Sequence, residues 1–316
     1  GYLKVNAKAV VLCCGDYGAN PEMRHYYAPW TEEFMGGVDD GRGQLMGIWA
    51  GGWMELGPHA PMTHHMGGSL GVDSFLQLNM EGKRFMNEDV PGQNIAAEHT
   101  RQPVAKDPEL AKAGVKAWQI FDSKWKDQIK YMDTGHGNVN WYVESGADVP
   151  NGSYGKNAYI SDEDNEDGNT PGFLSYFEGE KALGVTANSI AELAKLMEVD
   201  EAALTATIER YNELCEAGED ADFHKKPEDL QAIEKAPFYA IQITPNTNDS
   251  FGQLAISTKA EVLDADRKPV PGLYAGGTLG NAELFYMRYA VSGSSMCMGT
   301  VTGRIAAQSA LEYYGA

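Results

Sequence analysis

The sequence predicts an α/β fold in which α/β stretches at both ends of the chain enclose a helix-rich block. With that block included, the chain as a whole is expected to be α+β. Residues 7–14 form an apolar run followed by a glycine, which is typical of a buried strand that leads into a turn. Residues 260–277 predict strand, turn, strand and glycine, and residues 290–314 predict a long helix. Residues 189–217 carry a clear helical pattern between them. This order favours one domain built from both chain ends and interrupted by an inserted one.

The first part of the chain combines helix start signals with glycines that permit close packing. Asn20 and Pro21 predict a helix start, because asparagine caps helices and proline favours the first helical position. Residues 41–57 predict a helix packed closely on a sheet, and the glycines that allow this approach are Gly47, Gly51 and Gly52. Residues 75–86 predict strand, turn and strand, with MEGK at the turn.

The pattern weakens between residues 87 and 185, where prolines, glycines and polar runs dominate. The acidic stretch 161–172 has some likeness to a calcium-binding loop. Its glycine lies one place off, and its twelfth position is not glutamate, which favours a solvated loop.

Two helices with clear start signals follow this region. Ser189 and Glu192 form a capping box, and Asp200 is expected to cap the second helix. The expected apolar face of that helix comprises Leu204, Ile208, Tyr211 and Leu214. Residues 237–245 then predict a strand.

The composition excludes some classes of partner. Lys+Arg total 25 against 45 Asp+Glu, a formal net charge of −20 that repels nucleic-acid backbones and anionic lipid surfaces. No apolar run approaches the roughly 18–20 residues that a membrane-spanning helix needs. The cysteines form no C-x-x-C pair and are expected to be reduced and mostly buried: Cys13, Cys14, Cys215 and Cys297.

The start of the C-terminal helix is the first candidate for a ligand site. Gly293, Ser294 and Ser295 lie at its N-terminus, where free backbone N–H groups and the helix dipole favour a phosphate or a partly negative ring oxygen. An ordinary capped helix explains this stretch alone equally well. The segment KPVPGLYAGG at 268–277 favours a ligand, because a strand that ends in Gly-Gly lets backbone approach a cofactor.

Six segments of the chain occur in the order found in one group of flavoenzymes: AKAVVLCCGDYGANPEM, LNMEGKRFMNE, TIERYNELCEAGEDADF, PFYAIQITP, KPVPGLYAGG and SGSSMCMGTVTGRIA. On these segments, which extend over nearly the whole chain, the sequence resembles the fumarate reductase/succinate dehydrogenase flavoprotein superfamily. That superfamily includes 3-ketosteroid dehydrogenases and urocanate reductases. The resemblance implies a non-covalently bound FAD.

The resemblance also implies a division of the chain. Family members begin with a strand–GxGxxG–helix unit that holds the FAD pyrophosphate, and GRGQLM at 41–46 lacks the third glycine of that motif. The chain is therefore similar to the C-terminal part of such an enzyme, without its first FAD-binding segment. Residues 1–70 and 246–316 are expected to form an incomplete Rossmann-like FAD domain, and residues 71–245 a capping domain that closes over the substrate.

Two groups of residues are placed at the cofactor by the resemblance. The group expected along FAD comprises Gly15, Gly276, Gly277 and Thr278, where the family usually has glutamate in place of the threonine. The group expected to face the flavin pyrimidine ring comprises Ser294, Ser295 and Met296, and Gly293 is a further cofactor-binding candidate at the same helix start. There the helix dipole would stabilise negative charge on the reduced flavin by about 0.3–2 kcal/mol.

Substrate residues are implied in the same way. Arg288 matches an arginine that grips a substrate carboxylate in fumarate reductases, a task that suits the guanidinium fork. A structural ion pair is the alternative. His64, in MTHHM, is the best match to a substrate histidine, against the alternative of a partly buried, hydrogen-bonded histidine. Two adjacent histidines are too few for a metal site.

Two departures from the family argue against fumarate as the substrate. Gly92 stands where fumarate reductases have a proton-donating arginine, and Asp249 stands in place of a second histidine. Loss of a positioned proton donor costs about 10²–10⁴ in rate. Tyr286 and Tyr289 are the nearest replacements, as groups that polarise a ketone or supply a proton, although aromatic packing is an equal alternative.

The expected function is an FAD-dependent oxidoreductase that acts on CH–CH groups and reduces an activated C=C bond by hydride transfer from flavin N5. The substrate would be an unsaturated organic acid or enone other than fumarate. A ketosteroid-type dehydrogenase and a folded fragment without cofactor or activity are the alternatives. Whether a haem or iron–sulfur protein donates electrons, and whether the compartment is the cytoplasm or lies across the bacterial membrane, stay open.

Overall fold

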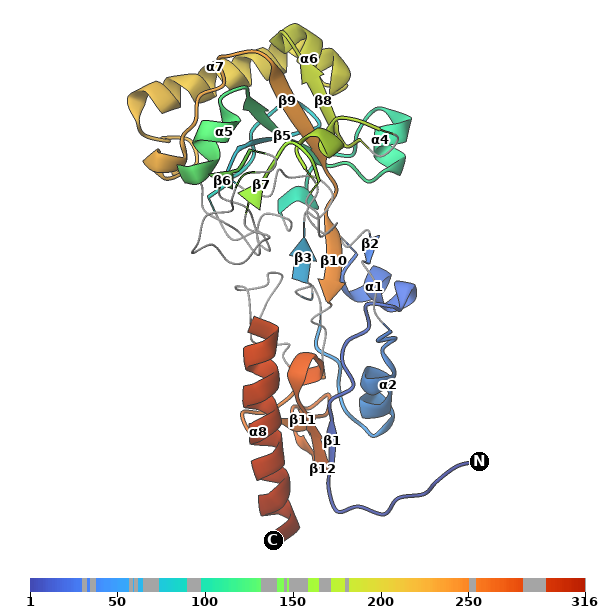
Figure 1. Ribbon diagram of the computed structural model, residues 1–316. Helices are drawn as coiled ribbons and strands as arrows, with labels where there is room; N and C mark the ends of the chain where they lie inside the picture. Colours follow the sequence, from blue (N-terminus) through green and yellow to red (C-terminus); the bar gives the residue numbers. More distant parts are fainter. Residues whose placement is uncertain are drawn as a thin grey trace. The chain divides into compact units, whose positions relative to one another are not determined.

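The computed structural model describes two compact units (Figure 1). Unit 1 comprises Gly1–His64 with Asn246–Ala316, and unit 2 comprises His65–Pro245. The roles expected for segments 1–70, 71–245 and 246–316 stay predictions. The described residues are 1–29, 33–34, 38–56, 59, 62–64, 74–89, 98–131, 141–144, 147, 159–164, 172–179, 182–249, 254–280 and 294–315. None of the helices described there is long and apolar enough to cross a membrane.

The main sheet of unit 1 joins strands from both ends of the chain. Its order is β1 (Val10–Leu12), β12 (Pro269–Ala275) and β11 (Glu261–Leu263). β1 runs parallel to β12, whereas β11 is antiparallel to it. The long helix α8 (Ser294–Gly315) packs on one face, where Tyr274 and Ala306 are buried together. The other face carries a separate apolar core of Leu12, Leu254, Val262, Leu273, Ala275 and Leu279.

β1 is shorter and less buried than the sequence predicts. Val10 is 47% exposed and Val11 38% exposed, and only Leu12 of this strand is buried. The expectation of mostly buried thiols is also wrong, because Cys13, Cys14 and Cys297 are exposed, and Cys215 is half-buried. The reason for the exposure at β1 is its position at the edge of the described sheet.

Two helices of unit 1 follow β1. α1 (Pro21–Tyr27) begins as predicted, with the side chain of Asn20 accepting hydrogen bonds from two backbone N–H groups of the first turn, each at 3.1 Å. α2 (Arg42–Trp49) ends well before residue 57, the expected end. Gly47 does allow close packing, since a Cβ there would collide with the side chain of Leu254, whereas Gly51 faces open space at φ +99°.

A second sheet of unit 1 has the order β2 (Glu33–Phe34), β10 (Asn246–Asp249) and β3 (Met62–His64). β10 is parallel to β2 and antiparallel to β3. The short 3-10 helix η4 (Gly277–Gly280) follows β12 directly and contacts α8.

Unit 2 is built on a four-stranded antiparallel sheet that the sequence pattern does not predict as a sheet. Its order is β4 (Leu76–Asn79), β5 (Ala117–Asp122), β9 (Phe238–Ile243) and β8 (Gly184–Ala187). β4 was expected to pair with a strand after the MEGK turn. In the structure only an isolated bridge between Leu78 and Arg84 forms there.

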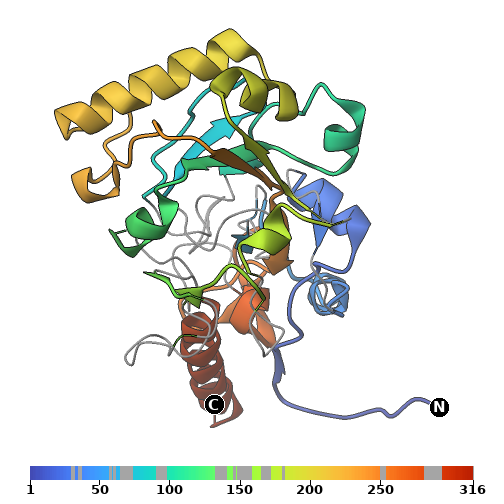
Figure 2. The ribbon, with the colours of Figure 1, turned by 45° about the horizontal axis from the view of Figure 1, so that its top comes forward.

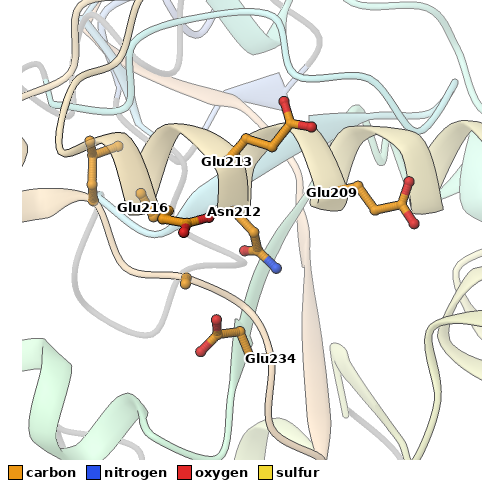
Figure 3. A pocket seen from close by; sticks show the side chains of 8 residues that line it. Glu209, Asn212, Glu213, Glu216 and Glu234 are labelled. Atoms are coloured by element: carbon orange, nitrogen blue, oxygen red, sulfur yellow. The ribbon is translucent and has the colours of Figure 1, made fainter.

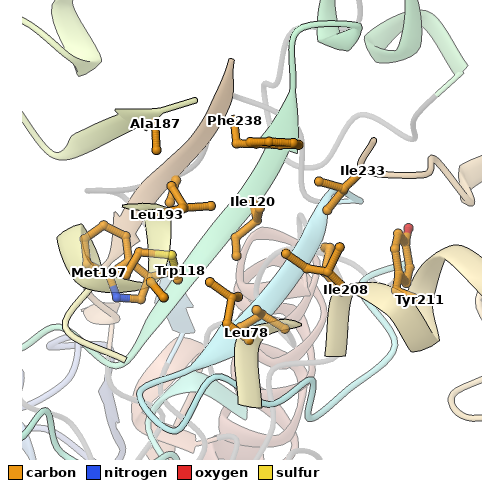
Figure 4. Packing of buried hydrophobic residues seen from close by; sticks show 14 of the residues in the cluster. Leu78, Trp118, Ile120, Ala187, Leu193, Met197, Ile208, Tyr211, Ile233 and Phe238 are labelled. Atoms are coloured by element: carbon orange, nitrogen blue, oxygen red, sulfur yellow. The ribbon is translucent and has the colours of Figure 1, made fainter. Parts of the chain in front are cut away.

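One face of this sheet is covered by α6 (Ile190–Leu196) and α7 (Glu201–Ala217), as Figures 1 and 2 show. Figure 4 shows the core between them, where Trp118 and Ile120 of β5 meet Leu193 of α6 and Ile208 of α7. The predicted caps are confirmed: Ser189 accepts from the backbone N–H of Glu192, and Asp200 from that of Ala203. All four residues of the expected apolar face of α7 are buried.

The other face of the sheet carries an aromatic core that includes Phe75, Phe121, Trp125 and Phe173. The smaller elements of unit 2 are α4 (Pro108–Lys112), α5 (Trp125–Gln128), η1 (Ile129–Tyr131), β6 (Trp141–Tyr142), β7 (Tyr159–Ile160), η2 (Leu174–Tyr176) and η3 (Pro227–Asp229).

Candidate functional site

Two neighbouring parallel strands of unit 1 end together, and glycines follow both. Leu12 lies opposite Ala275, and the N–H of Gly276 donates to the carbonyl oxygen of Leu12 at 3.0 Å. Gly15 follows β1, and Gly276 and Gly277 follow β12. In open α/β sheets, ligands bind outside the carboxyl ends of the strands. This edge is therefore the candidate cofactor site.

The direction of α8 brings its N-terminus to the same edge. Tyr274 donates to the carbonyl oxygen of Ser309 at 3.2 Å, and the N–H of Gly277 donates to Thr302 Oγ1 at 2.8 Å. α8 therefore runs antiparallel to β12, and its N-terminus lies toward the carboxyl end of the strand. Ser294 lies eight residues before Thr302, so the helix extends about 12 Å past the strand ends. The N-terminal end of its dipole carries partial positive charge, which favours an anionic ligand group at this edge.

Gly276 and Gly277 form a place where backbone is open to a ligand. A Cβ at Gly276 would contact the backbone of Thr302 and Gly303 at 3.3–3.4 Å, so this glycine allows the strand end to lie against α8. Gly277 has φ +67°, a conformation that favours glycine, and a Cβ there would meet open space. These residues fit a cofactor that approaches main-chain groups closely.

The turn after β1 is fixed by hydrogen bonds from Gly41 and Gln44. Gly15 has φ +77°, and a Cβ on it would collide with the carboxylate of Asp39. Gln44 Nε2 donates to the carbonyl oxygen of Gly15 at 3.3 Å, and the N–H of Gly41 donates to that of Asp16 at 3.2 Å. The turn therefore needs glycine at position 15 and is fixed to the segment that leads into α2.

A buried tyrosine–histidine pair lies behind this turn. Tyr17 donates from its hydroxyl to His59 Nδ1 at 2.6 Å, and His59 Nε2 donates to the carbonyl oxygen of Glu55 at 2.9 Å. The ring of Tyr27 stacks on His59 with centroids 4.8 Å apart. Burial lowers the pKa of His59 despite the opposing effect of Glu55, and burial together with Asp16 raises the pKa of Tyr17. The sequence pattern pointed to His64 and missed this pair.

The cofactor residues expected from the sequence come together in part. Thr278 lies in η4, half-buried, beside the glycine pair. At the start of α8, Ser294 is buried, Ser295 is half-buried and Met296 is 77% exposed. Gly293 lies outside the described residues.

The expected substrate residues are placed only by backbone or not at all. His64 on β3 pairs with Asn246 on β10, and Asp249 on β10 pairs with Met62, so the positions of the two family histidines lie on adjacent strands. The side chains of His64 and Asp249 are outside the described part of the structure. So are all of these residues: Gly92, Tyr286, Arg288 and Tyr289.

Unit 2 contains a buried charge network at the end of the segment LNMEGKRFMNE, residues 78–88. Arg84 donates to both Glu88 and Asp220, each at 2.7 Å, and these three side chains are at most 6% exposed. Burial raises the pKa of Asp220, but hydrogen bonds from Arg84 and from the N–H groups of Lys225 and Phe223 outweigh it and lower the pKa to about 2. The network joins Arg84 and Glu88 to Asp220, which lies 136 positions after Arg84.

An acidic groove runs along α7 in unit 2 (Figure 3). Two of its carboxylates form ion pairs: Glu213 pairs with Arg210 at 3.1 Å, and Glu234 pairs with Lys124 at 3.0 Å. Within the described residues, no cluster of three or more His, Cys, Asp or Glu side chains could hold a metal ion. We therefore regard the groove as a solvated surface.

Comparison with known proteins adds an independent result. A family model described as FAD binding domain matches residues 1–294. The chain is 28% identical over 329 residues to the fumarate reductase (cytochrome) of Shewanella frigidimarina, with 99% of this chain and 47% of the relative covered. It is 25% identical to the vinyl phenol reductase of Lactiplantibacillus plantarum, with 98% and 61% covered.

A solved structure shows the same fold. The 3-ketosteroid-delta4-(5alpha)-dehydrogenase of Rhodococcus jostii has a TM-score of 0.65 and 21% identity, with 96% of this chain and 52% of that chain covered. The chain thus spans about half the length of the curated fumarate reductases and of this solved structure.

Proposed function

Because the chain belongs to the family of FAD binding domains, we propose that it provides part of the cofactor and substrate sites of an FAD-dependent oxidoreductase that reduces carbon–carbon double bonds. The names of two relatives, a fumarate reductase and a vinyl phenol reductase, support this reaction class. The substrate is an unsaturated organic acid or enone. Residues 71–245 serve as the capping domain.

The observation that carries the proposal is the shared carboxyl edge of β1 and β12. The residues that would hold FAD there are Gly15, Gly276, Gly277 and Thr278, together with the start of α8 at Ser294, Ser295 and Met296. Gly293, which precedes α8 in the sequence, is proposed as a further contact. Backbone N–H groups at a helix start stabilise a group with negative charge, as a reduced flavin is.

When bound, FAD supplies the hydride that an activated alkene accepts. Arg288 binds a substrate carboxylate through two parallel N–H···O bonds, which fixes the orientation of the alkene. Tyr286 or Tyr289 delivers a proton to the carbon next to the one that receives hydride, and His64 contacts the substrate. Gly92 and Asp249, which replace an arginine and a histidine, support a substrate other than fumarate.

The electron donor is a second protein. The cytochrome in the name of the fumarate reductase relative supports a redox protein in this role.

Arg288 provides the test of the substrate class. We expect Arg288→Ala in the full-length protein to abolish reduction of unsaturated carboxylates, because alanine cannot form the two N–H···O bonds that hold the carboxylate. Arg288→Lys should restore part of the activity. Arg304→Ala, which removes an exposed arginine of α8, is the control and should leave the rate unchanged. The measurement is oxidation of reduced flavin or of an artificial electron donor with a panel of unsaturated acids.

The ketosteroid-type alternative predicts a different outcome. A steroid ring offers no carboxylate, so Arg288→Ala would leave steroid dehydrogenation nearly intact. Turnover of a 3-ketosteroid by the wild type, with little effect of Arg288→Ala, would overturn the reductase proposal.

A further inference from the structure

The hydrogen bonds around His59 determine the tautomer of its ring. The carbonyl oxygen of Glu55 can only accept, so His59 Nε2 carries the proton of that 2.9 Å bond. In a neutral ring Nδ1 then accepts, and Tyr17 must donate its hydroxyl proton in the 2.6 Å bond. Tyr17 is 0% exposed and His59 is 4% exposed, so water does not replace either partner.

Protonation of His59 breaks this arrangement. An imidazolium ring has N–H groups at both nitrogens, so Nδ1 no longer accepts and the Tyr17 hydroxyl proton loses its acceptor. A buried donor without an acceptor is costly. In the observed pair, only the neutral ring accepts the hydroxyl proton of Tyr17.

Tyr17 is also the side-chain anchor of the turn after β1. The neighbouring residues form hydrogen bonds within the turn and to a later segment: the N–H of Gly18 donates to Asp16 Oδ1 at 2.6 Å, and that of Ala19 to the carbonyl oxygen of Asp39 at 2.9 Å. The side chain of Tyr17 instead points into the buried cluster with Tyr27 and His59. A shift of Tyr17 therefore moves Gly15 and Asp16 directly.

We propose that His59, acting through Tyr17, is a positioning residue that holds the turn of residues 15–18 in its flavin-binding conformation only while its ring is neutral. This inference rests on the proposed function, because it assumes that FAD binds beside Gly15.

The groups that face His59 explain why its ring is neutral near pH 7. Among the described residues they are Tyr17 from the turn, Tyr27 from α1, and Glu55. The carboxylate of Glu55 is engaged by Arg267, with one N–H···O distance of 2.9 Å, which limits its attraction for a proton on His59. Burial lowers the pKa of the ring below its usual value near 6.5. FAD affinity is therefore full at neutral pH and falls as the pH drops through the lowered pKa.

The test measures the FAD dissociation constant by flavin fluorescence in the full-length protein, from about pH 8 down to the pH at which the protein begins to unfold. The variants are His59→Gln and Tyr17→Phe, and His25→Gln is the control because His25 is an exposed histidine of α1. Amide hydrogen exchange of residues 15–20, without FAD, is recorded at the same pH values. Tyr17→Phe removes a single oxygen and keeps the test decisive if His59→Gln does not fold.

We expect the wild-type and His25→Gln dissociation constants to rise by about tenfold per pH unit below a single midpoint. Amide exchange of residues 15–20 should accelerate at the same midpoint. His59→Gln should give a flat profile. Tyr17→Phe should bind more weakly at neutral pH and shift the midpoint upward, because the neutral ring loses its hydrogen-bond donor.

The outcomes separate this inference from the proposed function. Wild-type protein that binds no FAD at any pH would overturn both. FAD binding with a flat wild-type profile, or with a profile that Tyr17→Phe and His59→Gln leave unchanged, would overturn only the role of His59. A purely structural pair would lower the melting temperature of the variants and leave the profile in place.

Discussion

Two arginines of unit 2 bind neighbouring aspartates of one loop in very different surroundings. The Arg84 side chain is 6% exposed, and its partners Glu88 and Asp220 are fully buried. Arg210 binds Asp222 at 2.7 Å with the two side chains 49% and 34% exposed. A buried ion pair leaves an uncompensated charge when one partner is lost, whereas water replaces the partner of an exposed one.

We predict that Arg84→Ala lowers the free energy of unfolding by about 3–5 kcal/mol, because Asp220 stays buried without its cation and Glu88 keeps only Lys225, at 3.6 Å. Arg210→Ala is the matched control and should cause only a small fraction of that loss. Urea unfolding followed by circular dichroism measures both. Equal losses of unfolding free energy for the two variants would show that burial does not increase the contribution of the Arg84 ion pairs to stability.

Helices of unit 1 use glycine for two different reasons. In α2, Gly47 lies so close to Leu254 that even a methyl group would collide with it. In α8, a Cβ at Gly299 would meet open space. In the first position glycine is needed for packing, and in the second it only weakens the helix.

The same substitution should therefore have opposite effects at these positions. We expect Gly47→Ala to destabilise the protein by about 1–3 kcal/mol, because overpacking moves α2 from its core. Gly299→Ala should stabilise it by about 0.5–1 kcal/mol through helix propensity. Thermal unfolding of the two variants decides this, and a higher melting temperature for Gly47→Ala would contradict the packing.

Local sequence signals predicted two helix caps and one apolar helix face correctly. The caps at Asn20 and Asp200 and the apolar face of α7 depend on residues within a few positions of one another. β5 was missed because both of its faces are buried and Gln119 and Asp122 are buried with them, which removes the alternation that marks a strand.

The same limit applies to the site. The glycine pair after β12 could be found from a short motif, because a strand that ends in two glycines is a local pattern. The Tyr17–His59 pair could not, since the two residues are 42 positions apart and nothing in the sequence states that they meet.

At the scale of the whole molecule, the candidate cofactor edge depends on both ends of the chain. β1 and β12 are separated by most of the sequence, yet they pair in parallel and end at the same level. The chain also spans only about half the length of the curated fumarate reductases and of the solved structure. We propose that this shared edge holds FAD.

An FAD titration of Gly277→Ala in the full-length protein, followed by flavin absorbance and fluorescence, tests this proposal. Gly218→Ala is the matched control, because Gly218 in unit 2 has φ +68° against +67° for Gly277, and a Cβ at either position meets open space. Both variants place alanine in the left-handed region, at a cost of about 1–2 kcal/mol of stability.

We predict that the wild type and Gly218→Ala bind FAD equally well, and that Gly277→Ala raises the dissociation constant by at least about tenfold, or about 1.4 kcal/mol. Equal affinity of the two variants would place FAD elsewhere. A full-length wild type that unfolds cooperatively but binds no FAD would contradict the proposed cofactor site.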